Sequence, residues 1–219
     1  MPLRWINFTR LTLRFPQDIA ANFTAKFVAG AADVTIGEPL VTGVDMGPLV
    51  SSQQVDRMVS GVKDLLAAGG ELLLGDGKKM AAPVAGLEGG NWMAPTIIGG
   101  FTFADANKDA VLSEHQGPVV KIIVVEDLKE AVNAANAGPN GLSASLWSKD
   151  SDMAHSAAQA IDAGYVWVNN WLTRDLSMPF GGWKDSGNGQ RSGGTWDVDF
   201  YSYTKTVCME VTGRHKLMA

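Results

Sequence analysis

Short apolar runs alternate with stretches of helical periodicity along most of this chain. Tyr165–Val168 is a short apolar run of strand length, which is typical of a buried strand, and Val119–Val125 is also expected to be a strand. Ser51–Ala68 repeats apolar residues at helical spacing, and Ser51 or Ser52 could cap this helix. Strands that alternate with helices predict an α/β fold, in which a mostly parallel sheet has helices on both faces.

The remaining periodic segments extend this pattern. We expect further strands at Leu11–Phe15, Glu71–Leu74, Trp92–Ile98 and Leu142–Trp147, and further helices at Ile19–Ala32, Leu128–Ala137 and Ser151–Ala163. Ser151 is the expected cap of the last of these helices. Near the end, in Phe200–Val211, mostly aromatic and apolar residues stand at every second position from Tyr201. This alternation predicts one long final strand.

Composition excludes several classes of function. The 219 residues carry a net charge of −5, which gives no basic patch of the kind that nucleic acid requires. No apolar run reaches the length of a membrane span, and the first residues lack the apolar core of a signal peptide, so we expect a cytoplasmic protein without a membrane partner. The single cysteine excludes an internal disulfide, and three scattered histidines predict no metal site.

Amide, aromatic and charged residues gather directly after the strand Tyr165–Val168. Asn169 and Trp171 follow it at once, and Arg174 and Phe180 come next, before a pair of glycines. Open α/β sheets build their sites just beyond strand ends, so this stretch is a candidate site. The alternative is a core strand followed by a loop that glycine makes tight.

The same stretch carries a resemblance to a known family. Residues 166–187, VWVNNWLTRDLSMPFGGWKDSG, resemble a signature near the end of the catalytic domain of the aldehyde dehydrogenase superfamily, in particular of its 2-hydroxymuconic and 2-aminomuconic semialdehyde dehydrogenases. Other similar segments occur in family order: Thr9–Leu11, Val34–Pro39, Met46–Leu49, Met93–Thr96, Glu114–Pro118 and Tyr203–Val207. The resemblance covers the catalytic and C-terminal part of that family.

The resemblance implies a division of the chain and an assembly. Residues 1–196 would form the catalytic, substrate-binding domain, and residues 197–219 would form an oligomerisation strand and tail. In the family, one face of this domain packs against the dinucleotide domain. We expect that face to be apolar and uncovered here and the final strand to be unpaired, and both features predict a homodimer or a higher homo-oligomer.

The resemblance also suggests roles for residues of the candidate site. Arg174 matches the arginine that binds the substrate carboxylate in the muconic semialdehyde group, and a guanidinium fork suits a carboxylate. Asn169 could donate to a carbonyl oxygen, and Trp171 and Phe180 could form apolar walls. The alternatives are a surface ion pair between Arg174 and Asp175, a loop amide that satisfies local backbone groups, and aromatics that belong to the core.

A second candidate position lies in the loop before Val119–Val125. Glu114 matches the family glutamate that binds the nicotinamide-side ribose, although Gln116 stands where the family has an aromatic residue. Without the resemblance, Glu114 and His115 are a carboxylate beside an imidazole, which could act as acid and base. The alternative is that both are solvated loop residues.

The chemistry of the family's reaction is not evident in this chain. The family's nucleophilic cysteine should fall near Trp5, but residues 3–8 hold no Cys, Ser or Thr. Cys208 lies in the expected final strand, where we expect a buried, inert thiol. The family's dinucleotide domain has no counterpart, and no glycine-rich phosphate loop opens a helix. We therefore expect no bound cofactor, and no oxidation of aldehydes with NAD or NADP by this chain alone.

Three functions stay open on the sequence. The first is a repurposed enzyme, of isomerase, lyase or cyclase type, or a binding protein, that takes a small carbonyl or carboxylate metabolite. In it, Glu114, His115 and Asn169 would be catalytic, and Arg174, Trp171 and Phe180 would bind the substrate. The second is half of a split NAD(P)-dependent semialdehyde dehydrogenase that needs a partner chain. The third is a non-catalytic protein that binds a full-length homologue.

Overall fold

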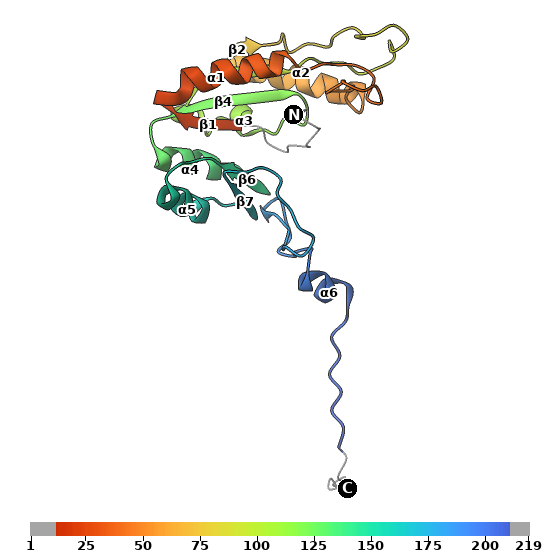
Figure 1. Cartoon of the computed structure of the whole chain (residues 1–219), viewed down its shortest axis with the longest axis vertical. Coiled ribbons are helices and arrows are strands. Elements are labelled where there is room, and N and C mark those ends of the chain that lie inside the picture. The colour runs from red at the N-terminus through yellow and green to blue at the C-terminus, as the bar shows by residue number, and fades with distance from the viewer. Residues whose placement is uncertain (1–11, 211–219) are drawn as a thin grey trace. The chain divides into compact units, whose positions relative to one another are not determined.

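The chain forms two compact units in a computed structural model that describes residues 12–210 (Figure 1). Unit 1 comprises residues 1–138 and unit 2 comprises residues 139–219. The boundary between these units falls inside the predicted 1–196 domain. The proposed division at residue 197 stays a prediction.

Unit 1 contains most of the helices and strands of the chain. They are β1 (Thr12–Pro16), α1 (Gln17–Ala32), α2 (Ser52–Ala67), β2 (Glu71–Leu74), β3 (Thr96–Thr102), the 3-10 turn η1 (Phe103–Asp105), α3 (Asp109–Leu112), β4 (Val119–Val125) and α4 (Leu128–Asn136). The Ser51 side chain accepts a hydrogen bond from the Gln54 amide, which confirms the predicted cap of α2. The strand predicted at Trp92–Ile98 is displaced toward the C-terminus, because β3 begins at Thr96.

A four-stranded sheet with the order β1-β4-β3-β2 organises unit 1. β4 pairs in parallel with both β1 and β3, while β2 pairs antiparallel with β3. The middle strands are buried: Ile97, Ile98, Ile122 and Ile123 are each at most 2 % exposed. This burial on both faces explains why adjacent positions of the middle strands are apolar instead of alternating with polar residues.

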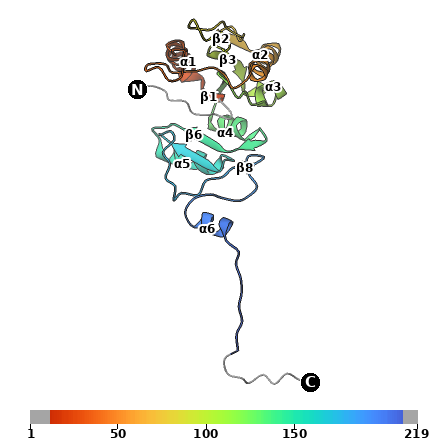
Figure 2. The same ribbon diagram turned by 90° about the vertical axis from the view of Figure 1, so that its right-hand side faces the viewer.

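Helices cover both faces of this sheet, as the sequence predicts. On one face, Ile97 and Ile122 pack with Ala20, Phe27 and other residues of α1. On the other face, residues of α2, α3 and α4 pack against the strands; they include Val55, Met58, Val62, Leu65, Val111 and Ala134. Figure 2 shows α1 and α2 on opposite sides of β3.

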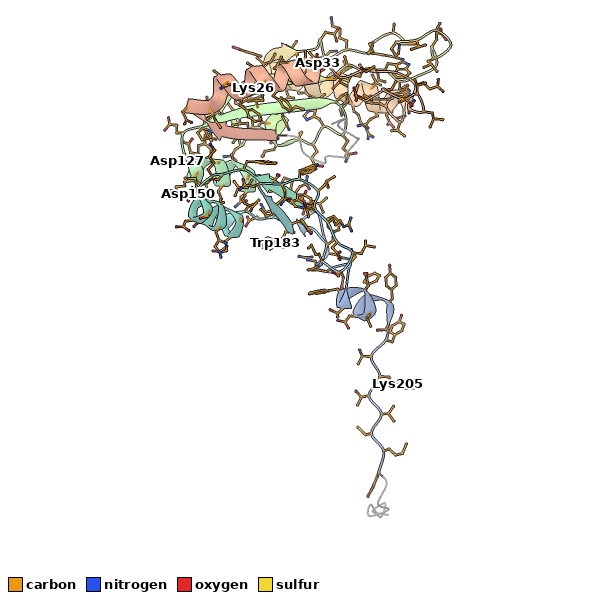
Figure 3. All side chains as sticks on the ribbon, viewed as in Figure 1. Lys26, Asp33, Asp127, Asp150, Trp183 and Lys205 are labelled. Atoms are coloured by element: carbon orange, nitrogen blue, oxygen red, sulfur yellow. The ribbon has the colours of Figure 1, made fainter. Side chains whose placement is uncertain are left out.

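Unit 2 is built from shorter elements. They are β5 (Asn140–Gly141), β6 (Ser143–Leu146), α5 (Ser151–Ala160), β7 (Tyr165–Val168), β8 (Trp183–Lys184) and α6 (Thr195–Tyr201). β6 and β7 form a parallel pair, and β5 and β8 form an antiparallel pair. Asp150 caps α5 and accepts from the Met153 amide at 2.9 Å, just as Asp127 caps α4 (Figure 3). The predicted cap at Ser151 is therefore wrong by one residue.

Two other predictions about the fold need correction. The strands do not form one mostly parallel sheet: they fall into three small sheets with both parallel and antiparallel pairing, so the fold is mixed α/β. The final strand predicted at Phe200–Val211 is also wrong over the described residues. Its first residues belong to α6, and no strand is assigned over residues 202–210. A helix satisfies its own backbone groups, whereas a strand needs a neighbouring strand.

Among the described residues, no helix has the length and apolar character needed to cross a bilayer.

Candidate functional site

The six predicted site residues divide between the two units. Glu114 and His115 belong to unit 1, in the loop that joins α3 to β4. Asn169, Trp171, Arg174 and Phe180 belong to unit 2, after β7. Each unit therefore has its own candidate site, and we describe the two separately.

In unit 1, the loop of residues 113–117 borders an open pocket of about 450 Å³. The other side of the pocket is the polar stripe of α2, which includes Gln54, Arg57 and Asp64. Gln54 holds the loop directly, because its Nε2 donates to the carbonyl of Gln116 at 2.7 Å. The pocket thus combines two carboxylates, Asp64 and Glu114, with one guanidinium and one imidazole.

His115 is the most buried polar residue that borders this pocket. Its side chain is only 6 % exposed, and its Nδ1 has no hydrogen-bond partner within the described part of the chain. The ring lies against Gly61 of α2, where a Cβ atom would come within 2.4 Å of its Nε2. Burial, followed by the positive charge of Lys121, lowers the pKa of His115 from 6.5 to about 4. His115 is therefore neutral at neutral pH, which makes it a poor general acid there.

Glu114 and Gln116 lie on either side of His115 in the sequence. Glu114 is half-buried at the pocket, where a carboxylate could accept hydrogen bonds from ligand hydroxyls. Gln116 is exposed. The unit 1 pocket therefore offers polar contacts, with no Phe, Tyr or Trp among the residues that border it.

In unit 2, Asn169 directly follows β7 and lies in the left-handed backbone region, with φ of 55°. Its side-chain amide bonds to the backbone of Ser148 at both ends. Oδ1 accepts from the Ser148 N–H at 2.8 Å, and Nδ2 donates to the Ser148 carbonyl at 2.8 Å. This geometry gives Asn169 a structural task, which is to tie the end of β7 to the residues after β6.

An aromatic cluster forms one side of the loop after β7. Tyr165 and Trp167 share a face of the strand, with ring centroids 4.7 Å apart. Trp171 packs on Trp167 at 4.9 Å, and Phe180 packs on Tyr165 at 5.9 Å. Trp167 also donates from its Nε1 to the Thr173 carbonyl at 2.8 Å. The predicted walls, Trp171 and Phe180, are therefore half-buried members of one cluster.

Arg174 extends over this cluster. Its guanidinium carbon lies 4.2 Å from the centroid of the Phe180 ring, and the residue as a whole is exposed. Asp175 forms no ion pair with it. Instead, the Asp175 carboxylate accepts from the N–H and the hydroxyl of Ser177, and these bonds lower the pKa of Asp175. The alternative interpretation of Arg174 and Asp175 as a surface ion pair is thus not what the structure shows.

Three residues of these sites did not stand out in the sequence. Tyr165 and Trp167 fitted a buried strand, and only their two-residue spacing indicated that both rings face the same side. Lys121 interrupts the apolar run of β4 and is 1 % exposed. A charged residue in the middle of a buried strand was the available signal, since such a charge must find partners.

Comparison with known proteins shows the family of this chain. Residues 7–207 match the model of the aldehyde dehydrogenase family. The chain is 36 % identical over 196 residues to the 2-hydroxymuconic semialdehyde dehydrogenase of Pseudomonas sp. (strain CF600), covering 89 % of this chain and 39 % of that protein. It is 34 % identical over 195 residues to the 2-aminomuconic semialdehyde dehydrogenase of Danio rerio, with the same coverage of 89 % and 39 %.

Solved structures agree with the sequence comparison. The fold matches a crystal structure of the NAD-dependent aldehyde dehydrogenase from Sinorhizobium meliloti with a TM-score of 0.83 and 30 % identity, covering 95 % of this chain and 39 % of that one. The chain thus spans about two fifths of the length of the curated relatives that it matches, at 39 % for both named above. On this evidence, the chain belongs to the aldehyde dehydrogenase family.

Proposed function

We propose that this chain binds a small carbonyl metabolite that carries a carboxylate, and that Arg174 is the residue that binds the carboxylate. The observation that carries the proposal is the position of the Arg174 guanidinium over Phe180, without an ion pair to Asp175. A ring face orients a guanidinium through its π-electrons and leaves the N–H donors available for two parallel hydrogen bonds to a carboxylate.

The aromatic cluster suits the rest of such a ligand. Trp171 and Phe180 present apolar surface beside the cation, which fits a short carbon chain that ends in one charged group. The names of the relatives support the same class, since a semialdehyde has a carboxyl group at one end and an aldehyde at the other.

Binding is better supported than acid–base catalysis. Isomerase, lyase or cyclase chemistry would need proton transfer by Glu114, His115 or Asn169. However, His115 is neutral at neutral pH, and the Asn169 amide is bonded to Ser148 at both ends. A base with a pKa of about 4 accepts a proton poorly at neutral pH, and an amide does not titrate, which leaves Glu114 alone of the three to transfer a proton. Carboxylate binding is therefore the better-supported proposal.

Calorimetric titration of the purified chain tests this proposal. The ligands are a short dicarboxylate, the matching semialdehyde, and an uncharged aldehyde of the same length. We expect the two carboxylates to bind and the uncharged aldehyde to bind at least tenfold more weakly. Arg174→Ala should weaken carboxylate binding by about 1.5–3 kcal/mol, the usual range for a hydrogen bond to a charged group. Arg174→Lys should recover only part of this loss, because an ammonium lacks the fork.

Lys149→Ala is the matched control, since Lys149 is an exposed cation of the same unit outside the aromatic cluster. If Arg174→Ala and Lys149→Ala bind the dicarboxylate equally well, Arg174 is only a surface residue and the proposal is wrong.

A second candidate is half of a split NAD(P)-dependent semialdehyde dehydrogenase. The observation that favours it is the half-buried Glu114 at the unit 1 pocket, since the family resemblance assigns this residue to the ribose of the cofactor. This candidate predicts that the pure chain forms no NAD(P)H from semialdehydes, and that a partner chain restores the reaction. Formation of NAD(P)H by the pure chain at ordinary enzyme rates would exclude this candidate. It would also contradict our expectation that the chain alone does not oxidise aldehydes.

A further inference from the structure

Lys121 is a charged residue at the centre of the unit 1 sheet. It lies in β4, between β1 and β3, and pairs in register with Thr12 on one side and Ile98 on the other. The side chain is 1 % exposed, so its ammonium group is removed from water. A buried charge is strongly destabilising unless it is paired or hydrogen-bonded, so its contacts indicate what the residue does.

Two hydrogen bonds of Lys121 converge on the end of α3. Its Nζ donates to the carbonyl of Val111 at 2.8 Å and to the carbonyl of Ser113 at 2.5 Å. Val111 is in the last turn of α3, and Ser113 is the residue that ends this helix. The last carbonyls of a helix have no partner within the helix, and a cation is favoured there. Lys121 therefore supplies the donors that the end of α3 requires.

The loop that bears Glu114 and His115 begins at this point. The Ser113 carbonyl is bonded to Lys121, and the next two residues are Glu114 and His115. Beyond them, the Gly117 amide donates to the His115 carbonyl at 2.9 Å, and the chain enters β4 at Val119. The loop is thus fastened at its start by a side chain from the same strand that it leads into.

We propose that Lys121 is a positioning residue, whose buried ammonium joins the C-terminal end of α3 to β4 and so fixes the loop that carries Glu114 and His115. This role keeps the unit 1 pocket in a preformed state. It concerns a different unit from Arg174, and so does not depend on carboxylate binding in unit 2.

Two substitutions separate the hydrogen bonds of Lys121 from its charge. Lys121→Met removes both. Lys121→Gln removes the charge and keeps an N–H₂ group that can reach one carbonyl. We expect the amides of residues 111–117 in Lys121→Met to lose hydrogen-exchange protection on the order of tenfold or more, relative to the amides of β3 and β4. In Lys121→Gln, the same amides should lose less hydrogen-exchange protection, because one hydrogen bond can persist.

The imidazole of His115 gives a second readout, which a purely structural role of Lys121 would not move. The charged groups that face His115 are Lys121 from β4, Asp64 and Arg57 from α2, and the adjacent Glu114. Because the positive charge of Lys121 lowers the pKa of His115, both substitutions should raise it above the value of about 4, as measured from the ring proton shifts by NMR.

Lys108→Met is the matched control. Lys108 also donates to a carbonyl at a helix end, that of Ala68 at 2.7 Å, but its side chain is 46 % exposed and pairs with Asp105. We expect this variant to leave both the loop protection and the pKa of His115 unchanged. If the Lys121 variants and the Lys108 variant behave alike, the proposal is overturned.

The unaltered protein provides a test that does not require any variant to fold. If Lys121 fixes the loop, the amides of Val111, Leu112 and Ser113 should exchange within about tenfold of those of β4. Exchange at the rate of a freely solvated loop would overturn the proposal.

Discussion

Arg174 places its guanidinium carbon 4.2 Å from the ring centroid of Phe180, six residues further along the chain. Between the two residues, the Asp175 carboxylate bonds to Ser177, and the Met178 N–H donates to the Asp175 carbonyl at 3.1 Å across a turn. The turn thus brings a cation and an aromatic ring together, while the neighbouring carboxylate is occupied by a serine. This arrangement keeps the Asp175 carboxylate off the guanidinium and underlies the first prediction.

Removing the Phe180 ring should disorder Arg174. In Phe180→Leu, we expect the upfield ring-current shift of the Arg174 side-chain protons to disappear in NMR spectra. Carboxylate binding should weaken by about 0.5–1 kcal/mol, the usual strength of an exposed cation–π contact. Trp183→Leu, which removes a 45 % exposed ring of the same unit outside the aromatic cluster, should change neither quantity. Unchanged Arg174 shifts in Phe180→Leu would show that the contact does not persist in solution.

Asn169 should behave as a structural residue. Asn169→Ala removes two hydrogen bonds to Ser148 and leaves a φ of 55° that alanine disfavours, so we expect a loss of about 2 kcal/mol in the free energy of unfolding. Asn169→Gly relieves the backbone strain and should lose less. Asn170→Ala removes a single bond, to the Val168 carbonyl, and should cost least. Urea unfolding followed by tryptophan fluorescence measures all three, and an equal cost at positions 169 and 170 would contradict this assignment.

The pKa of His115 should make the stability of unit 1 depend on pH. The folded-state pKa, about 4, is lower than the ordinary value of 6.5, so the unfolded chain binds more protons between these pH values. The contribution of His115 to the free energy of unfolding should therefore be fully present above about pH 6.5 and should decrease as the pH falls toward 4. At roughly 1.4 kcal/mol for each unit of pKa, the total loss is about 3–4 kcal/mol.

Urea midpoints of the unit 1 core, followed by NMR between pH 4 and pH 8, measure this dependence. His115→Leu should flatten the curve in the window from 4 to 6.5. His155→Ala, in which an exposed histidine of α5 is removed, should retain the dependence of the unaltered protein. A curve that is the same in all three proteins would mean that His115 is not the titrating group.

We predict that the protein is a homodimer or a higher homo-oligomer. Between α6 and residue 210, where the described part of the chain ends, seven large apolar or aromatic side chains are each at least 45 % exposed: Trp196, Val198, Phe200, Tyr201, Tyr203, Val207 and Met209. Apolar surface concentrated in one segment is a sign of a covered interface. Light scattering at low micromolar concentration should give a mass of at least twice 23.3 kDa.

Val198→Glu combined with Phe200→Glu should reduce that mass to the monomer value. Leu40→Glu, a charge added at a 93 % exposed residue of unit 1, is the control and should leave the mass unchanged. A monomer mass for the unaltered chain would contradict the prediction, and binding of a related full-length dehydrogenase in its place would favour the interpretation as a non-catalytic partner.

Local patterns in the sequence were sufficient to predict most helices and strands. β2, β4 and β7 lie where their apolar runs predict them, and α2 begins after the serine cap. The signature around Asn169 to Phe180 was sufficient to indicate the family. These features depend on residues close together in the chain, whose spacing alone determines which face they share.

Contacts between residues distant in the sequence were decided only by the tertiary structure. The residues of β2 predict a strand, but its antiparallel direction follows from its pairing with β3. Phe200–Val211 alternates like a strand, yet its first two residues belong to α6 and no strand is assigned over residues 202–210. The position of Asn169 just after a strand suggests an amide that binds a ligand, but the structure bonds it to Ser148, 21 residues away.

Lys121 shows the physical reason for this division. Its sequence neighbours predict only that it lies in a buried strand, where a charge is costly. Whether that charge is tolerated depends on two carbonyls, 8 and 10 residues away, which reach its ammonium only because α3 packs on the same face of the sheet. Periodicity determines which side chains are buried, but the partner of a buried polar group is determined by the packing of separate elements.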